Sequence, residues 1–293
     1  MSSLKRRAPQ GVKRAGRRAA IAFGRRTAGL RLAPSFVLVG GQRCGTTSLF
    51  RALQAHPAVL GPVFHKGVNY FDVNYDKGWS WYLGHFPTAA RAGWVGRRAG
   101  QRVVTFDASG YYSHHPHAPL RLAKDLPDVK ILLMVRDPVE RAFSAYKHEY
   151  ARGFETETFD RALELEDERV APELERMLDD PSYYSFSHRH HAYRRRGYYD
   201  EQIARFTEHL PADRVLVVDS GDFFTEPEAE YRRVSDFLGL SSYTPPRFDR
   251  WNARPSDPLD PQLRERLSSD FASHDRALEG LLGRTPSWRR SGA

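Results

Sequence analysis

The hydrophobic residues of this chain fall into short continuous runs that are separated by segments with helical spacing. Apolar runs of this kind are typical of strands buried on both faces of a sheet, whereas apolar residues three and four positions apart are typical of helices. The runs stand at residues 36–40, 103–106, 131–135 and 215–218, and the helical segments at 46–56, 138–150, 160–170, 198–209, 226–239 and from Pro261 onward. This alternation predicts a single α/β domain, with a parallel sheet flanked by helices.

Residues 61–100 show neither pattern and are rich in aromatic residues and glycine. We expect a long, loop-rich insertion there. Long ordered loops in α/β domains usually carry function, so this insertion is a candidate wall of the functional site.

Positive charge is concentrated at the beginning of the chain. The 293 residues include 45 Lys and Arg against 36 Asp and Glu, a formal net charge of +9. Residues 1–34 contain ten basic and no acidic side chains, which leaves 35 basic and 36 acidic ones in the rest. We expect residues 1–34 to be a flexible basic arm, which is either a solvated tail or a contact for anionic lipid. The nearly neutral remainder argues against a specific nucleic-acid-binding function.

The composition also limits the compartment. The single cysteine, Cys44, excludes an internal disulfide bond and a zinc site built on several cysteines. No run approaches the roughly 20 apolar residues of a membrane-spanning helix, and the apolar run at 19–23 is too short for a signal peptide. The simplest interpretation is a cytoplasmic protein, with a possible peripheral contact to the inner membrane surface through the basic arm.

The first predicted strand continues into a segment with the spacing of a phosphate-binding loop. Residues 40–47 read Gly-Gly-Gln-Arg-Cys-Gly-Thr-Thr and match G-x-x-x-x-G-K-S/T, except that Thr46 stands where lysine belongs. The backbone N–H groups of such a loop form a cradle for an anion. A P-loop kinase needs that lysine and a magnesium ion, so kinase or NTPase chemistry is the alternative and not the main hypothesis. The cation inside this loop is Arg43.

A second segment places an arginine at the end of a buried strand. Arg136 follows the run 131–135, at the edge of the sheet where α/β proteins bind ligands. Ser144 lies about two turns along the helix that begins at Pro138, so an arginine and a hydroxyl could share one phosphate. Asp137 could bind magnesium, pair with a neighbouring arginine or cap the helix.

These residues resemble the sulfotransferases that use 3′-phosphoadenosine 5′-phosphosulfate (PAPS), in particular the bacterial subgroup similar to heparan sulfate N- and 3-O-sulfotransferases. The resemblance divides the chain into the arm 1–34, a sulfotransferase domain at 35–285 and a tail at 286–293. It implies transfer of a sulfuryl group from PAPS, without a metal, to a hydroxyl or amine of a carbohydrate, glycolipid or small metabolite. Besides the loop, Arg136 and Ser144, it rests on residues 74–87, 107–112, 197–199 and 237–240.

The resemblance also implies the cofactor contacts. Arg43 takes the place of the family's usual lysine, and Arg136 and Ser144 would bind the 3′-phosphate. The 5′-phosphosulfate would bind to Gly41, Gln42, Arg43, Cys44, Gly45, Thr46, Thr47 and Ser48, and Tyr198 and Arg254 would complete the nucleotide site.

The catalytic base is left open, because this chain departs from the family there. In the family, the segment after the first helix often reads Lys-Glu-Pro-His-(Phe/Tyr)-Phe, and its glutamate is the proposed base. Here residues 66–71 read Lys-Gly-Val-Asn-Tyr-Phe, so Gly67 stands at the glutamate position. The candidate bases are Asp107 and His65, followed by Asp72, while Lys66 and Arg43 would stabilise the transferred group.

The acceptor is predicted only as a class. The aromatic residues of 64–94 suit sugar rings or lipid-like groups, and the arginines of 183–196 suit an anionic acceptor. The histidines of that second segment, His188, His190 and His191, could also indicate a metal site, although no carboxylate or cysteine partner is evident in the sequence. A non-enzymatic adaptor that acts through the basic arm is the remaining alternative, and the oligomeric state stays open.

Overall fold

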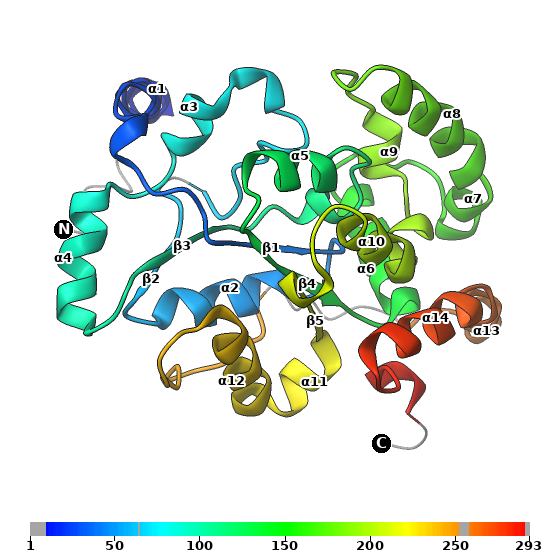
Figure 1. The fold of residues 1–293 in the computed structure, drawn as a ribbon. Coiled ribbons are helices and arrows are strands. Elements are labelled where there is room, and N and C mark those ends of the chain that lie inside the picture. Colours follow the sequence, from blue (N-terminus) through cyan, green and yellow to red (C-terminus); the bar gives the residue numbers. More distant parts are fainter. Residues whose placement is uncertain (1–9, 64, 252–257, 291–293) are drawn as a thin grey trace.

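The computed structural model of the chain describes residues 10–63, 65–251 and 258–290. A five-stranded sheet with the order β2-β3-β1-β4-β5 forms its centre, and all neighbouring strands are parallel (Figure 1). The strands are β1 (Phe36–Gly40), β2 (Val59–Leu60), β3 (Val104–Asp107), β4 (Lys130–Val135) and β5 (Val215–Asp219). The predicted α/β fold with a parallel sheet is therefore confirmed.

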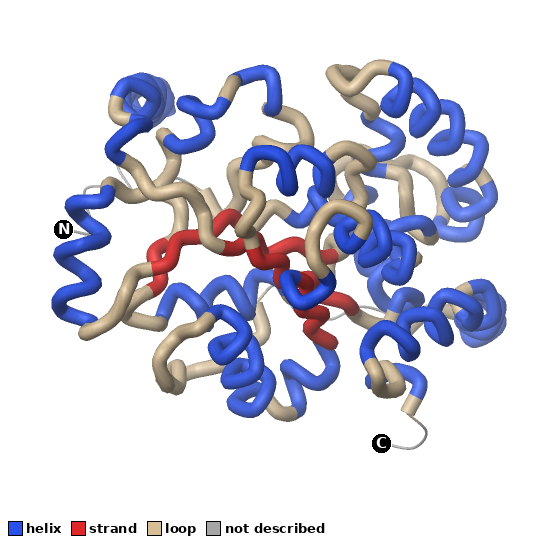
Figure 2. Tube along the Cα trace, in the orientation of Figure 1, coloured by secondary structure: helices blue, strands red, loops and turns tan. Residues whose placement is uncertain are grey.

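Helices cover both faces of the sheet (Figure 2). Helices α2, α11 and α12 lie on one face, α5 and α10 lie on the other, and α6–α9, α13 and α14 gather toward the carboxyl ends of β1 and β4 (Figure 1). Their bounds are α1 (Gln10–Arg26), α2 (Thr46–Ala55), α3 (Trp79–Leu83), α4 (Ala89–Ala99), α5 (Ala118–Asp125), α6 (Pro138–Tyr150), α7 (Phe159–Glu164), α8 (Glu166–Asp179), α9 (Phe186–His190), α10 (Tyr199–Thr207), α11 (Ser220–Thr225), α12 (Pro227–Leu238), α13 (Pro261–Asp270) and α14 (Ala272–Leu282).

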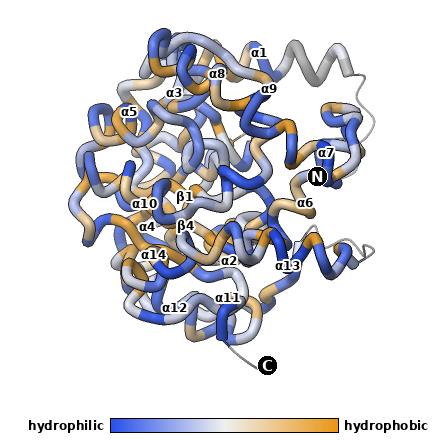
Figure 3. The backbone as a smooth tube through the Cα atoms, turned by 90° about the vertical axis from the view of Figure 1, so that its right-hand side faces the viewer, coloured by the Kyte–Doolittle hydropathy of each residue, from blue (hydrophilic) through white to orange (hydrophobic). Residues whose placement is uncertain are grey.

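The two central strands build the core and position the site. Every residue of β1 is buried, and β4 is buried from its second residue on, because helices cover both faces. Figure 3 shows these two strands among the helices, with the backbone coloured by hydropathy. The strands pair in parallel, with Val37 beside Ile131 and Gly40 beside Met134. Their carboxyl ends therefore lie next to each other, so the segments that follow β1 and β4 emerge side by side.

Residues 61–100 contain more helix than the sequence indicated. Helices α3 and α4 lie in this segment. The Thr88 hydroxyl caps α4 by accepting a hydrogen bond from the Arg91 N–H, and Gly100 ends the helix in the left-handed conformation. The aromatic and glycine content hid these helices, because apolar spacing in a helix half exposed to solvent is weak.

The described part of the basic arm, residues 10–34, is not an extended tail. Its helix α1 packs against α3, where Gly24 and Gly84 bring the two backbones together. A Cβ atom on Gly24 would lie 2.5 Å from the Gly84 carbonyl oxygen, so the contact requires glycine. The expectation of flexibility does not hold for this helix. The domain boundary at residue 34 stays a prediction.

The C-terminal segment is also attached to the sheet. The backbone N–H and hydroxyl of Ser287 bind the Asp219 carboxylate at the end of β5, at 2.8 and 2.7 Å. Residues 286–290 of the predicted tail therefore lie against the domain. Within the described residues, no helix has both the length and the apolar character needed to cross a membrane.

Candidate active site

Two cavities meet at the loop that follows β1. We call them the Ser144 cavity, of about 460 Å³, and the His190 cavity, of about 590 Å³, each after one of its lining residues. Arg43 and Thr46 line both. A ligand in one cavity can therefore face a ligand in the other across these two residues.

The loop owes its tight shape to its backbone conformation. Gly40 and Gly45 have positive φ angles of 144° and 80°, and a Cβ atom on Gly40 would lie 2.6 Å from the Met134 carbonyl oxygen. Arg43 also has a positive φ, 75°, a conformation that non-glycine residues seldom adopt. Such strain is often found at ligand-binding sites. Helix α2 begins at Thr46, so its N-terminal N–H groups lie at the same place as the loop.

The predicted 3′-phosphate ligands lie beside this loop. Arg43 Nε donates a hydrogen bond to Ser144 Oγ at 3.0 Å, and Arg136 Nη1 donates to the Arg43 carbonyl oxygen at 3.2 Å. All three residues line the Ser144 cavity. The parallel register of β1 and β4 brings them together. Asp137 accepts hydrogen bonds from the N–H groups of Val139 and Glu140. Of the three roles considered for this carboxylate, it therefore has that of the N-terminal cap of α6.

Aromatic side chains complete the Ser144 cavity. Phe224 and Trp251 line it, and the Arg250 guanidinium lies 4.7 Å from the Phe224 ring centre. The Trp251 N–H donates to Ser48 Oγ at 3.0 Å, which ties the segment to α2. The predicted cofactor ligand Arg254 lies outside the described residues.

Lys66 brings a second cation to the loop, beside Arg43. Its Nζ donates to the hydroxyls of Thr46 and Thr47, at 2.7 and 3.2 Å. Burial lowers the pKa of Lys66 to about 8, because the charged form loses hydration. The lysine that a P-loop carries at the position of Thr46 is thus replaced in space by a lysine from another segment.

Three predicted cofactor contacts lie away from the two cavities. The side chains of Cys44 and Ser48 line neither the Ser144 cavity nor the His190 cavity. Burial raises the pKa of the Cys44 thiol. Tyr198 stacks on His274 with ring centres 3.9 Å apart and also lines neither cavity. The neighbouring Tyr199 is the one that contacts the site, since its hydroxyl donates to the Arg136 carbonyl oxygen at 2.8 Å.

Comparison with known proteins identifies this arrangement. Residues 33–252 match the family described as the sulfotransferase domain. The chain belongs to the sulfotransferase family. The predicted family is therefore confirmed.

Individual relatives agree with this assignment. The human bifunctional heparan sulfate N-deacetylase/N-sulfotransferase 2 is 28% identical to this sulfotransferase over 292 residues, which cover 88% of this chain and 31% of the relative. The human heparan sulfate glucosamine 3-O-sulfotransferase 3B1 is 28% identical, with coverage of 71% and 46%. The chain thus spans between about a third and a half of these two relatives. The crystal structure of a sulfotransferase from Alicyclobacillus acidocaldarius is 30% identical, with a TM-score of 0.65, and covers 88% of this chain and 100% of its own.

The first candidate base, Asp107, already accepts four hydrogen bonds from the protein. Its side chain is 0% exposed and accepts hydrogen bonds from the Val68 N–H and from the hydroxyls of Ser109, Tyr112 and Tyr82, at 2.8–3.3 Å. Burial raises its pKa. Asp107 therefore holds the segment around Val68 to the end of β3, which is a structural role.

The second candidate, His65, lies near helix α1. Burial lowers its pKa, and Arg17 of α1 lowers it further. His65 lines neither the Ser144 cavity nor the His190 cavity. The structure therefore does not bring it to the phosphate loop.

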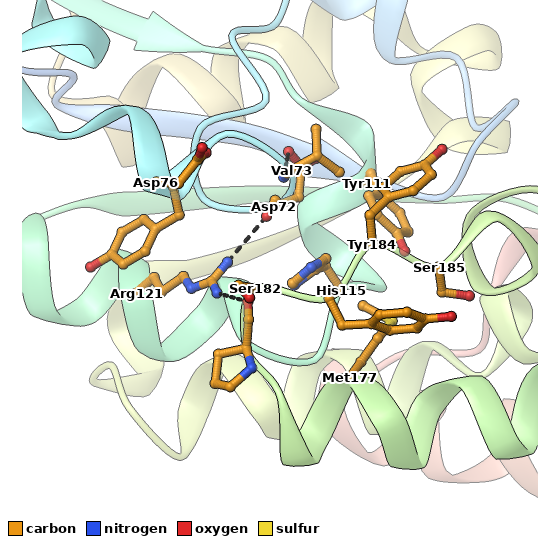
Figure 4. Close-up of a pocket in the computed structure, with 13 residues that line it drawn as sticks. Asp72, Val73, Asp76, Tyr111, His115, Arg121, Met177, Ser182, Tyr184 and Ser185 are labelled. Atoms are coloured by element: carbon orange, nitrogen blue, oxygen red, sulfur yellow. Dashed lines mark hydrogen bonds between the residues drawn. The ribbon is translucent and has the colours of Figure 1, made fainter.

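The third candidate, Asp72, faces a separate cavity of about 320 Å³ (Figure 4). Its Oδ1 accepts a hydrogen bond from the Val73 N–H, whereas its buried Oδ2 has no hydrogen-bond partner in the part of the chain that the structure describes. Burial raises the pKa of Asp72 to about 7. Arg121 is held at the edge of this cavity by the backbone oxygens of residues 71, 72 and 181. Tyr111 and Tyr184 line both this cavity and the His190 cavity, so Asp72 belongs to the neighbourhood of the site but not to its centre.

The surroundings of Gly67 leave no room for the glutamate that the family often has at this position. A Cβ atom there would lie 2.6 Å from the Ala108 carbonyl oxygen and 2.7 Å from Ser109 Oγ. The backbone occupies the space that a side chain would need. In this conformation, residue 67 therefore has no room for the side chain of a catalytic base.

Glu149 and His190 form a pair in the His190 cavity that the sequence did not indicate. His190 Nδ1 lies 3.0 Å from Glu149 Oε2, and Gln42 Nε2 donates to Glu149 Oε1. Burial alone would raise the pKa of Glu149, but the hydrogen bonds from His190 and Gln42 lower it below its usual value. One signal was present: Arg141 and Glu149 are charged residues at helical spacing on the buried face of α6.

The three histidines of the second segment have separate partners. His188 Nδ1 lies 2.8 Å from the Tyr111 hydroxyl, and His191 Nε2 lies 2.9 Å from the Phe154 carbonyl oxygen. Across the described ranges, no group of three or more metal-ligating side chains is found. The histidines therefore do not act as one ligand set in this arrangement.

Proposed function

We propose that the protein transfers a sulfuryl group from PAPS to a hydroxyl or amine of an anionic carbohydrate. The nucleotide would bind in the Ser144 cavity and the acceptor in the His190 cavity. The observation that carries this proposal is that Arg43 and Thr46 line both cavities. A sulfuryl group bound at these residues is within reach of an acceptor on the other side.

The Ser144 cavity offers two anion-binding places, as PAPS requires. Arg136 and Ser144 would bind the 3′-phosphate, the first as a charged fork and the second as a neutral donor. The loop N–H groups, Lys66 and the hydroxyl of Thr47 would hold the 5′-phosphosulfate. Phe224 would contact the adenine ring.

The transfer itself needs charge stabilisation. When the sulfuryl group leaves the 5′-phosphate, negative charge grows on the departing phosphate and on the sulfuryl oxygens. Arg43 and Lys66 lie where they would stabilise both, and preorganised donors in a partly dry site are effective at this. These two side chains would supply the positive charge that a metal ion supplies in phosphoryl-transfer enzymes, so the proposed reaction uses no metal.

The charge of the His190 cavity supports an anionic sugar as the acceptor. It is lined by four arginines, Arg43, Arg152, Arg189 and Arg196, and by one carboxylate, Glu149. The aromatic side chains of Tyr111, Tyr184, Phe154 and Phe186 also line it and would contact sugar rings. The two human relatives named above are heparan sulfate enzymes, which supports this acceptor class.

The location is part of the proposal. We place the enzyme in the cytoplasm, with α1 in contact with an anionic membrane surface. Arg17, Arg18, Arg25 and Arg26 of α1 are exposed, and the nearby side chain of Phe23 is 64% exposed. Cations beside an exposed aromatic ring are typical of helices that bind lipid surfaces.

The direct test incubates the protein with ³⁵S-labelled PAPS and a de-N-sulfated heparan sulfate oligosaccharide, and measures labelled oligosaccharide. We expect transfer without added metal, and tight calorimetric binding of adenosine 3′,5′-bisphosphate (PAP). Magnesium-dependent ATP hydrolysis together with no PAP binding would instead favour the kinase or NTPase alternative.

A further inference from the structure

We infer that His190, held by Glu149, takes the proton from the acceptor in place of the glutamate that Gly67 excludes. The inference rests on the proposed function and names the base of the same site. His190 would be a catalytic residue, and Glu149 a positioning residue that acts through it.

The contact between the two side chains fixes the imidazole tautomer. The Glu149 side chain is 0% exposed, and its lowered pKa keeps it ionised near neutral pH. An ionised carboxylate only accepts hydrogen bonds, so the His190 Nδ1 that lies 3.0 Å from it carries the hydrogen. The lone pair is then on Nε2, which is the nitrogen that can accept a proton.

The pair is coupled to the phosphate loop. Gln42, which precedes Arg43, donates through Nε2 to the second oxygen of Glu149, and its Oε1 accepts from Arg196 Nη1 at 3.4 Å. His190 lines the same cavity as Arg43 and Thr46. Of the titratable residues considered as bases, Asp107, His65 and Asp72 do not line this cavity.

Two aromatic rings restrain the imidazole. The ring centres of Phe154 and Phe186 lie 4.7 and 4.6 Å from that of His190, and the His190 side chain is 9% exposed. Little rotational freedom and little water remain around it. Both favour a general base that is oriented before the acceptor binds.

The proposed step balances as follows. The acceptor O–H or N–H gives its proton to His190 Nε2, and the freed lone pair forms a bond to the sulfur of PAPS. The bond between that sulfur and the 5′-phosphate oxygen breaks, and its electron pair leaves with PAP. The imidazolium ion so formed faces Glu149, which compensates its charge.

Other charged groups also act on this pair. Arg152 lies 3.7 Å from Glu149, and Arg189, Arg196 and Arg43 line the same cavity together with His148. The arginines oppose protonation of the imidazole, whereas Glu149 favours it. Loss of Glu149 should therefore move the acid limb of the pH–rate profile to lower pH.

The test compares His190→Gln and Glu149→Gln with a control variant, His191→Gln. His191 is the adjacent histidine, and both its ring nitrogens contact protein atoms, Ser187 Oγ and the Phe154 carbonyl oxygen. For transfer to the oligosaccharide, His190→Gln should lower kcat by about 10²- to 10⁴-fold with little change in the KM for PAPS. It should also remove the acid limb of the pH–rate profile, while Glu149→Gln should shift that limb and His191→Gln should leave it unchanged.

A second reaction separates a base from a structural residue. Formation of PAPS from PAP and 4-nitrophenyl sulfate releases 4-nitrophenolate, which leaves without a proton, so His190→Gln should retain this reaction. Equal loss in both reactions, or oligosaccharide transfer within about threefold of the unaltered protein, would overturn the inference. If the unaltered protein neither binds PAP nor transfers labelled sulfate to the oligosaccharide, the proposed function itself fails. Calorimetric PAP binding confirms that each variant is folded, and His190→Asn replaces a variant that is not.

Discussion

Replacing Arg136 by methionine should remove the preference of the protein for PAP over AMP, which lacks the 3′-phosphate. Arg136 Nη1 is held by the Arg43 carbonyl oxygen at 3.2 Å, Nη2 lies 3.6 Å from Glu140, and the side chain is 35% exposed. Its guanidinium is therefore oriented but partly hydrated. Methionine retains most of the side-chain length and removes only the charged fork.

The magnitude follows from two charge-assisted hydrogen bonds to one phosphate. Each contributes about 1.5–3 kcal/mol when well shielded. Partial exposure lowers the combined contribution of the two hydrogen bonds to the binding free energy to about 2–4 kcal/mol. This corresponds to about 30- to 1,000-fold in Kd. The Kd of PAP should rise by this factor, whereas the Kd of AMP should change by less than about threefold.

Calorimetric titration of both nucleotides at one salt concentration measures this difference. Arg161→Met is the control, because Arg161 lies on α7 and forms an exposed pair with Glu164. An unchanged Kd for PAP would refute the assignment of the 3′-phosphate to Arg136. An equal loss for PAP and AMP would show that Arg136 acts by supporting the loop through Arg43 and not by contacting that phosphate.

Three further predictions concern Lys66, Gly67 and helix α1. Burial lowers the pKa of Lys66 to about 8, so its ammonium group is charged below that pH and neutral above it. The affinity for PAP, measured by calorimetry, should therefore fall between about pH 7 and 9. The Lys66→Met variant should not show this fall. In urea titrations, Gly67→Ala should lower the free energy of unfolding by about 1–3 kcal/mol. Gly93→Ala in helix α4 should raise it slightly, because a Cβ there would make only an ordinary contact, 3.7 Å, with Arg97 Nη1. Sedimentation with vesicles that contain phosphatidylserine should be weaker for the double variant Arg25→Glu/Arg26→Glu and unchanged for uncharged vesicles.

The nucleotide side of the site could be predicted from the sequence because parallel strands impose it. Arg43 follows β1 and Arg136 follows β4, and the carboxyl ends of neighbouring parallel strands lie at the same edge of the sheet. Ser144 then follows from the helical repeat of α6. The hydrophobic pattern indicates the strand ends and the helical spacing, whereas the assignment of these residues to the 3′-phosphate came from the family resemblance and stays a prediction.

The acceptor side could not be predicted in the same way. Asp107 was a reasonable candidate base, since it also ends a strand, but nothing local in the sequence reveals that Tyr82 and Tyr112 would saturate its carboxylate. The contact between Glu149 and His190 joins segments that are far apart in the chain. Their pairing depends on how α6 and α9 pack, and apolar spacing does not encode that.

The shared wall of the two cavities has a kinetic consequence. In the proposed arrangement, donor and acceptor occupy separate spaces whose linings, within the described residues, share only Arg43 and Thr46, so neither molecule has to pass through the other's binding place. Both substrates can be present together, and the sulfuryl group can pass directly between them with no covalent enzyme intermediate. Initial-rate plots that intersect, as for a ternary complex, are the behaviour such an enzyme should show, in contrast to the parallel lines of a ping-pong reaction.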